Sequence, residues 1–270
     1  MDIKFTVILP VYKKVDFKTF CKSFDSLIKQ TLIPNEIIVV LDGPVKGNII
    51  NYINEKKKFY KFLRLIIFPI NKGLGPVLKI ATKLSSYEYI VRCDADDISK
   101  PERFELQMKF LNKNKDIDVL GSNVYEIENN RIVSKKKVDH LHEKIIKKIY
   151  FRNPINHSSV IFKKKTILKS GNYEDVKYFE DYFLWMKVFA HNGKFHNLEN
   201  YLVNMNIDDQ FFKRRSGLDY SKFYFNFLIK LRSRNLISMT NFILNLMLRL
   251  IIILMPVFLV KRIYKNILRN

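Results

Sequence analysis

Cysteine is scarce in this sequence: only Cys21 and Cys93 occur among 270 residues. Two thiols cannot form the dense disulfide framework of a small secreted protein, so that class is excluded and a reducing compartment is favoured. The N-terminal stretch MDIKFTVILPVY lacks the long apolar core and cleavage site of a signal peptide, so none is expected. Internal repeats and low-complexity linkers are absent. With 47% hydrophobic residues, the chain is not disordered, and its length suits one large domain or a domain with an extension.

Acidic residues are also few. The chain has 26 Asp and Glu against 48 Lys and Arg, a formal net charge of +22. Such an excess implies an anionic partner: nucleic acid, an anionic membrane surface or a phosphorylated substrate. The charge is spread along the chain, and codon bias also produces lysine-rich proteins. Composition therefore does not choose among these partners.

Apolar, β-branched runs alternate with helical patterns through the first half of the chain. They predict strands at 5–12, 36–43, 63–70 and 88–96, with helices at 16–30, 46–58 and 74–85 between them. This order is typical of an α/β fold with a doubly wound, mostly parallel sheet whose strands are buried on both faces. Ligands of such sheets bind beyond the carboxyl ends of the strands.

The second half is less regular. Its patterns predict strands at 116–127, 131–138 and 157–164, and helices at 140–151 and 180–193, the last ended by Gly193. From about residue 236 the chain becomes a strongly apolar tail.

Polar residues, glycine and proline gather where the first four strands should end. The four strand ends are Pro10-Val11-Tyr12, Asp42-Gly43, Asn71-Lys72-Gly73 and Asp94-Ala95-Asp96-Asp97. After the last of them, Ser99 and Glu102 form a capping-box pattern with Pro101 in the first turn, which predicts a helix directly after the acids.

The three acids at the end of the fourth strand need a partner, because like charges this close repel one another. Alternate residues of a strand share a face, so Arg92, Asp94 and Asp96 should point the same way and Asp97 elsewhere. A pair of carboxylates suits Mg²⁺ bound partly through substrate phosphates. A capping turn with solvated acids would explain one acid but not the alternating pair.

Two other acidic motifs fit less well. A calcium loop of the EF-hand type counted from Asp94 requires glycine at its sixth position, where this chain has Ser99. An aspartyl phosphatase of the DxDx[TV] type uses its first Asp as nucleophile. This chain matches that motif only weakly. Ile98 follows the third acid where the motif has Thr or Val, and the acids lie at the fourth predicted strand instead of the first.

Eight segments, in this order, resemble glycosyltransferase family 2, which comprises inverting enzymes with the GT-A fold. The resemblance spans roughly residues 5–217 and is greatest to bacterial enzymes that build O-antigen or capsule repeat units. The segments are VILPVYK, IIVVLDGP, NKGLGP, EYIVRCDADDISKPERFELQ, DIDVLGSN, NPINHSSVIFKK, EDYFLW and KRRSG.

The resemblance implies a binding site for a nucleotide sugar, a UDP-sugar by preference. Pro10 and Tyr12 would contact the uracil, and Asp42 the base or the ribose. Other members of the nucleotide-sugar site would be Asn71, Gly73, Arg92, Arg214 and Arg215, the last two closing over the diphosphate from a loop.

The same resemblance assigns the metal and the chemistry. Asp94 and Asp96 would be the DxD acids, with Asp94 towards the ribose and Asp96 on a Mn²⁺ or Mg²⁺ ion that bridges the diphosphate. Asp181 would be the general base, with Glu180 beside it on the acceptor side. His157 would contact the acceptor or help to hold the metal, or else be a partly buried histidine bonded to the backbone.

Two positions depart from the family pattern. Phe183 stands where many relatives have a second acid, and Lys79 stands where relatives often have Asn. Neither change affects the DxD acids or Asp181.

The tail raises the question of a membrane. Between Phe242 and Val260 the chain is almost wholly apolar and about as long as a membrane span. A span would bury Arg249 at a cost of about 2.5–3.5 kcal/mol and would place Lys261 and Arg262 outside, against the positive-inside bias. A helix lying in the interface avoids both costs, because Arg249 reaches the headgroups and the flanking cations meet anionic lipid. A helix buried in the core of the protein is the remaining alternative.

The sequence therefore predicts a GT-A catalytic domain over residues 1–215, with a nucleotide-binding half at about 1–100 and an acceptor half at about 101–215. Residues 216–270 would form a basic, apolar helical tail, of which 236–270 bind the membrane. The expected protein is a metal-dependent inverting glycosyltransferase of cell-surface polysaccharide synthesis, peripheral on the cytoplasmic face. It would move a sugar to a hydroxyl of a glycan or lipid-linked acceptor.

Two alternatives remain open. One is a basic protein that binds membranes or nucleic acid, in which the acids are structural. We expect no nucleic-acid partner, because no recognised motif is present and the acids concentrate at strand ends. The other is an inactive homologue that only binds nucleotide sugars, against which the retention of Asp96 and Asp181 argues.

Overall fold

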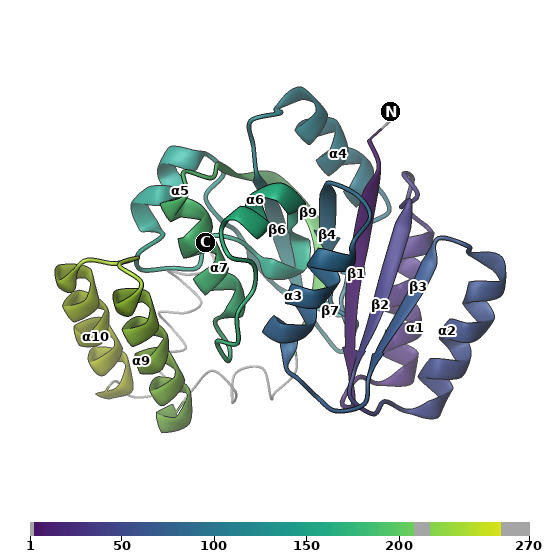
Figure 1. Ribbon diagram of the computed structural model, residues 1–270, viewed down its shortest axis with the longest axis horizontal. Helices are drawn as coiled ribbons and strands as arrows, with labels where there is room; N and C mark the ends of the chain where they lie inside the picture. The colour runs from purple at the N-terminus through teal and green to yellow at the C-terminus, as the bar shows by residue number, and fades with distance from the viewer. Residues whose placement is uncertain (1–2, 208–216, 255–270) are drawn as a thin grey trace.

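The computed structural model describes residues 3–207 and 217–254 (Figure 1). The strands are β1 (Phe5–Tyr12), β2 (Glu36–Asp42), β3 (Leu63–Phe68), β4 (Tyr89–Arg92), β5 (Ile98–Ser99), β6 (Val119–Glu128), β7 (Arg131–Lys136), β8 (Ile161–Lys163) and β9 (Phe195–Asn206). The helices are α1 (Phe17–Ile28), α2 (Gly47–Phe59), α3 (Leu74–Leu84), α4 (Arg103–Lys113), α5 (His142–Lys148), α6 (Lys164–Lys169), α7 (Glu180–Ala190), α9 (Gly217–Ser233) and α10 (Met239–Leu254). A short 3-10 helix covers His157–Ser159.

Within the described residues the strands form one nine-stranded sheet with the order β3-β2-β1-β4-β8-β6-β9-β5, and β7 pairs with β6. The first four positions are parallel, as the alternation of apolar runs predicts. Helices α1, α2 and α4 supply the buried side chains on one face of these strands, and α3, α6 and α7 those on the other. The prediction of a doubly wound parallel sheet is confirmed for this half.

The second half of the sheet is mixed. β8 runs antiparallel to both β4 and β6, and β5 runs antiparallel to β9, whereas β6 and β9 are parallel. The fold is therefore α/β with a mixed sheet, and "mostly parallel" describes only β1 to β4.

Several predicted boundaries near the acids are wrong. The strand expected at 88–96 ends at Arg92, because the chain turns there: the Asp97 amide donates to the carbonyl of Asp94 at 3.4 Å. The capping box does not form, since Ser99 lies in β5 and is paired with β9, and α4 begins only at Arg103. The strand expected at 157–164 is reduced to Ile161–Lys163.

The short strand β5, helix α6 and the 12-residue strand β9 were not predicted, whereas α9 lies in the expected helical tail. β9 carries the sequence FHNLENYLVNMN, whose many Asn residues hide the alternation typical of a strand. It forms because most of its residues pair with β6, which is a tertiary contact.

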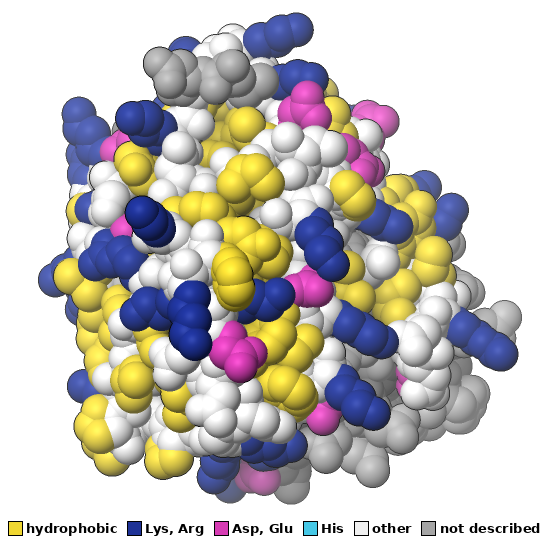
Figure 2. All heavy atoms as spheres, turned by 90° about the vertical axis from the view of Figure 1, so that its right-hand side faces the viewer, with side chains coloured by type: hydrophobic (Ala, Val, Ile, Leu, Met, Phe, Trp, Pro, Cys, Tyr) yellow, Lys and Arg dark blue, Asp and Glu magenta, His cyan; other side chains and the backbone are white. Residues whose placement is uncertain are grey.

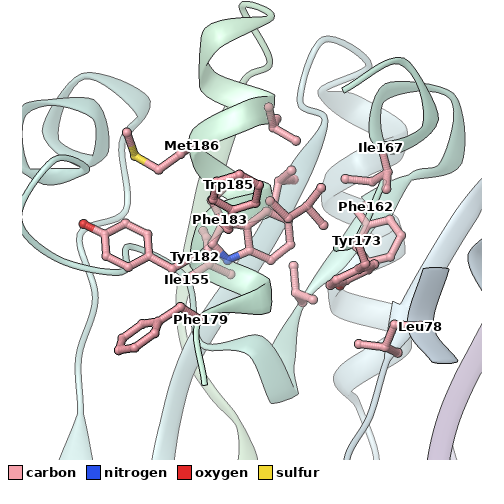
Figure 3. Close-up of a cluster of buried hydrophobic side chains, with 14 of the residues drawn as sticks. Leu78, Ile155, Phe162, Ile167, Tyr173, Phe179, Tyr182, Phe183, Trp185 and Met186 are labelled. Atoms are coloured by element: carbon pink, nitrogen blue, oxygen red, sulfur yellow. The ribbon is translucent and has the colours of Figure 1, made fainter. Parts of the chain in front are cut away.

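Helix α7 is almost wholly buried. Trp185 is fully buried among aromatic and aliphatic side chains of the core around this helix (Figure 3). Trp185 is therefore a core residue and not a platform on which a ligand could stack.

Helices α9 and α10 form an antiparallel pair beside α7 (Figure 1). Phe227 of α9 is buried and stacks on Phe179 with 4.8 Å between ring centroids. Asn245 of α10 accepts from the Tyr224 hydroxyl at 2.8 Å and donates to the carbonyl of Tyr150 at 3.0 Å. The described part of the expected tail thus packs on α7 and on the residues around it.

The sequence predicts that Arg249 reaches lipid headgroups, but in the structure its side chain packs against α9. Its guanidinium donates to the Ser221 hydroxyl at 3.1 Å and lies over the rings of Tyr220 and Tyr224. Among residues 3–207 and 217–254, no helix is both long and apolar enough to cross a bilayer. Residues 255–270, which complete the expected membrane segment, lie outside the described part of the chain.

Candidate active site

The predicted nucleotide contacts gather at the carboxyl edge of β1 and β2. Tyr12 and Asp42 are paired in register, and Tyr12 is exposed whereas Pro10 is buried within β1. The buried carboxylate of Asp42 accepts from the Asn71 side-chain amide at 2.9 Å, and from the backbone amides of Lys72 at 2.6 Å and Gly73 at 3.1 Å. These bonds hold the loop before α3 against the end of β2.

Glycine is required where this loop meets the rest of the site. Gly73 has a φ of +88°, and a Cβ on Gly75 would lie 2.2 Å from the carbonyl oxygen of Glu174 and 3.3 Å from Cβ of Glu180. The start of α3 therefore packs directly on the segment that precedes α7, which brings the nucleotide end of the sheet to Glu180.

The acids of the fourth strand lie in a loop over α1. Arg92, with a side chain 3% exposed, forms a two-pronged ion pair with the half-buried Asp94. The Ser23 hydroxyl of α1 donates to the carbonyl of Asp94 at 2.9 Å. Asp97 points away, as predicted, and accepts from the amide of Asn206 at 2.8 Å. Arg92 and Asp94 thus meet, and half-buried Asp96 stands between Asp94 and the buried Asp97 along the loop.

The predicted base lies at the first turn of α7. Asp181 accepts from the Asn153 side-chain amide at 2.7 Å and from the amide of Tyr182 at 2.7 Å. Burial raises the pKa of Asp181, and the bond from Asn153 opposes that rise. Burial and the adjacent charge of Asp181 raise the pKa of Glu180 to about 7. The charge of Arg92, the ion-pair partner of Asp94, lowers the pKa of both carboxyls.

The site can thus offer a nucleotide end, an acidic loop for a cation and a pair of carboxyls whose pKa values are raised by burial. Arg214 and Arg215 fall outside the described residues. Within those residues, no cluster of three His, Cys, Asp or Glu side chains has the geometry of a metal site. Asp94 and Asp96 could each contribute an oxygen ligand to a cation, and substrate phosphates would then have to complete its coordination shell.

The sequence profile of glycosyl transferase family 2 matches residues 6–172, more than half of the chain. The chain belongs to this family. It is 30% identical to the Escherichia coli UDP-Gal:alpha-D-GlcNAc-diphosphoundecaprenol beta-1,3-galactosyltransferase, over 99% of this chain and 97% of that one. It is 29% identical to the Erwinia amylovora amylovoran biosynthesis glycosyltransferase AmsE, over 81% and 82% of the two chains.

Solved structures agree with this assignment at the level of the fold. S. aureus TarS 1-349 in complex with UDP-GlcNAc has a TM-score of 0.67 at 20% identity, and the match covers 85% of this chain and 66% of that chain. The mannosyltransferase PcManGT from Pyrobaculum calidifontis, in complex with GDP-Man and Mn2+, has a TM-score of 0.58 at 14% identity, over 77% and 58% of the two chains. The predicted family and glycosyltransferase activity are confirmed.

In this family 2 enzyme, His157 is engaged inside the protein. Its Nε2 lies 2.9 Å from the Tyr173 hydroxyl, and its ring packs edge-on against Trp185. Burial and the charge of Arg92 hold the pKa of His157 well below its usual range, so the ring is neutral. The hydrogen-bond partner is a side chain and not the backbone.

Two residues that organise the glycosyltransferase site were not predicted. The side chain of Asn153 orients Asp181 by a hydrogen bond. The side chain of Arg103 stabilises the acid loop. The fully buried guanidinium of Arg103 donates to the Ser99 hydroxyl at 2.9 Å and the Arg92 carbonyl at 3.1 Å, which lie at the two ends of the loop. Neither residue stands next to its partner in the chain, so no local pattern could have revealed these contacts.

The raised pKa of Glu180 leads to a prediction on stability. A carboxyl whose pKa is higher in the folded than in the unfolded state holds its proton more tightly when folded, so stability falls as pH rises from the unfolded value near 4.5 to about 7. Glu180→Gln should therefore raise Tm relative to the wild type at pH 8 and leave it unchanged at pH 4. Thermal unfolding without added metal measures this. Equal Tm differences at both pH values would show that folding does not raise the pKa of Glu180.

Proposed function

We propose that this enzyme transfers a sugar from a UDP-sugar to a hydroxyl group of a lipid-linked glycan, with inversion, during synthesis of a cell-surface polysaccharide. The observation that carries the proposal is the carboxylate pair Glu180–Asp181 at the start of α7. Arg92, which forms an ion pair with Asp94 of the DxD loop, also lowers the pKa of both of these carboxyls. A base with a raised pKa thereby stands across from the residues expected to hold the diphosphate.

The donor end of the site suits a nucleotide. Exposed Tyr12 offers an aromatic face on which a base can stack, and Asp42 beside it is held by the loop at 71–73. The TarS complex with UDP-GlcNAc and the Escherichia coli relative that uses UDP-Gal support uridine as the base.

The residues present fit a divalent cation of the Mg²⁺ or Mn²⁺ kind. These ions are bound in proteins by one or two carboxylates together with substrate phosphates, which matches a loop with Asp96 and Asp94. Because Asp94 is already paired with Arg92, Asp96 is the better ligand, and Asp94 is left to orient the ribose. When bound, the ion would neutralise negative charge on the diphosphate leaving group.

Asp181 supplies the proton acceptor for the attacking hydroxyl. The raised pKa of Asp181 increases its strength as a base. The hydrogen bond from the Asn153 side chain to one carboxylate oxygen fixes the orientation of the group. A single base suffices for a direct displacement, in which the new glycosidic bond forms as the bond to the diphosphate breaks. That sequence inverts the anomeric configuration and needs no covalent intermediate.

The acceptor and the location follow from the relatives and from the C-terminal helices. The Escherichia coli relative is named for an acceptor that is a diphosphoundecaprenol-linked sugar. α10 exposes several apolar side chains, and residues 261–269 add four cations to the chain beyond it. We therefore place the enzyme at the cytoplasmic face of the membrane as a peripheral protein.

The alternative of a nucleic-acid binder has little support. On the face formed by α2 and β3, Lys and Arg side chains are scattered between polar and apolar ones and form no stripe (Figure 2). A panel of UDP-sugars and GDP-sugars tests the proposal: each is incubated with Mn²⁺ or Mg²⁺ and with lipid-linked or soluble sugar acceptors. Nucleotide release that needs a UDP-sugar and an acceptor is expected. Transfer from GDP-sugars alone would overturn the choice of donor.

A further inference from the structure

The hairpin formed by β6 and β7 exposes two apolar side chains beside its turn, a region of residues 129–133 that we call the tip. Residues 129–133 are all exposed, and among them Ile132 is 55% and Val133 is 49% exposed. Neighbouring residues of a strand point to opposite faces, so the exposure of both shows that neither face of β7 is covered at this point. Exposed cations flank the tip at Arg131, Lys135 and Lys137.

The tip lies on the catalytic edge of the sheet. β6 is antiparallel to β8, which is antiparallel to β4, so β6 points the same way as the strand that leads into the acids. At its end, Ile127 pairs with Asn206, whose amide donates to Asp97 of the acid loop. The charge of Lys136, at the other end of β7, lowers the pKa of Asp181.

A second exposed apolar surface flanks the same site. Arg249 of α10 lies 4.8 Å from the ring centroid of Tyr220, and that ring lies 5.3 Å from Phe179, which immediately precedes Glu180. The last described turns of α10 are therefore close to the start of α7. Their exposed side chains include Met247, Leu248, Leu250 and Ile251.

We propose that the β6–β7 tip and the end of α10 dock together on an anionic bilayer, so that the active site opens towards the membrane surface. Two exposed apolar surfaces, one of them flanked by Arg131, Lys135 and Lys137, match the chemistry of an interface between acyl chains and acidic headgroups. A second copy of the chain is a poorer occupant, because pairing the tips would bring Arg131, Lys135 and Lys137 of both copies together. The inference rests on the proposed lipid-linked acceptor, whose sugar would enter from the headgroup layer.

Vesicle binding by the full chain tests the proposal. Ile132→Ser/Val133→Ser should lower the partition coefficient on vesicles of anionic and zwitterionic lipid roughly tenfold or more, since it removes both apolar side chains of the tip. The matched control is Phe59→Ser. Phe59 is 78% exposed beside Lys57 and Lys58, but it ends α2 at the opposite edge of the sheet, so vesicle binding should not change.

Three further measurements make the outcome decisive. Tm and UDP affinity should be unchanged in the tip variant, and transfer to an acceptor embedded in vesicles should fall while transfer to a water-soluble acceptor is kept. Wild-type vesicle binding by the tip variant would overturn the proposal, as would equal losses in the Phe59→Ser control. A dimer in light scattering that the tip variant dissociates would assign the surface to a second copy instead. If the wild type transfers sugar to neither acceptor, the proposed function is wrong. The vesicle-binding result would then still test the membrane surface independently of that function.

Discussion

Asp181→Asn is expected to lower kcat by roughly 10²-fold or more, because the amide keeps the shape of the side chain but cannot accept the proton of the attacking hydroxyl. The affinity for the UDP-sugar should change little, since Asp181 is bonded to Asn153 whereas Tyr12 and Asp42 lie at the ends of β1 and β2. Initial rates with saturating donor and acceptor, together with calorimetric binding of UDP, measure the two quantities separately.

Asn153 provides the comparison for this variant. Asn153→Ala removes the donor to Asp181 and leaves the carboxylate itself in place. The bond from Asn153 lowers the pKa of Asp181, so its loss should move the acidic limb of the pH–rate profile to higher pH. Loss of UDP affinity in Asp181→Asn, parallel to the loss of rate, would identify Asp181 as a donor ligand or a structural residue.

Asp96→Ala should abolish metal-dependent turnover. The loop offers two carboxylates, and Asp94 is already committed to Arg92, so removal of Asp96 takes away the ligand best placed to hold a cation on the diphosphate. EDTA should suppress turnover of the wild type, and added Mn²⁺ should restore it. Binding of Mn²⁺ in the presence of UDP, followed by electron paramagnetic resonance, reports on the same site without turnover.

Asp97→Asn is the matched control, since it changes an acid of the same loop. Asp97 is buried and accepts from the amide of Asn206, and an asparagine oxygen can accept the same bond. The turnover of the Asp97→Asn variant should therefore depend on added metal as that of the wild type does. Full activity of the wild type in the presence of chelator would rule out the metal role for Asp96.

The parallel half of the fold could be predicted from the sequence because its signals are local. β1, β2 and β3 are apolar runs that pair along their whole length, and the helices between them carry their own periodicity. The family resemblance likewise depends on short motifs, each of which is contiguous in the chain. The prediction failed where an element depends on a distant partner. β9 looks like a polar loop until β6 pairs with it, and Ser99 resembles a helix cap until β5 meets β9.

The candidate site shows the same division. By itself, the sequence determined which residues could do chemistry: the acids at the end of the fourth strand and the carboxylates Glu180 and Asp181. Only the tertiary structure decided their state. Burial raises the pKa of both carboxyls of α7, and Arg92 takes Asp94 as its ion-pair partner. Desolvation and charge pairing depend on which groups surround a side chain in space, and here those groups come from separate strands and helices.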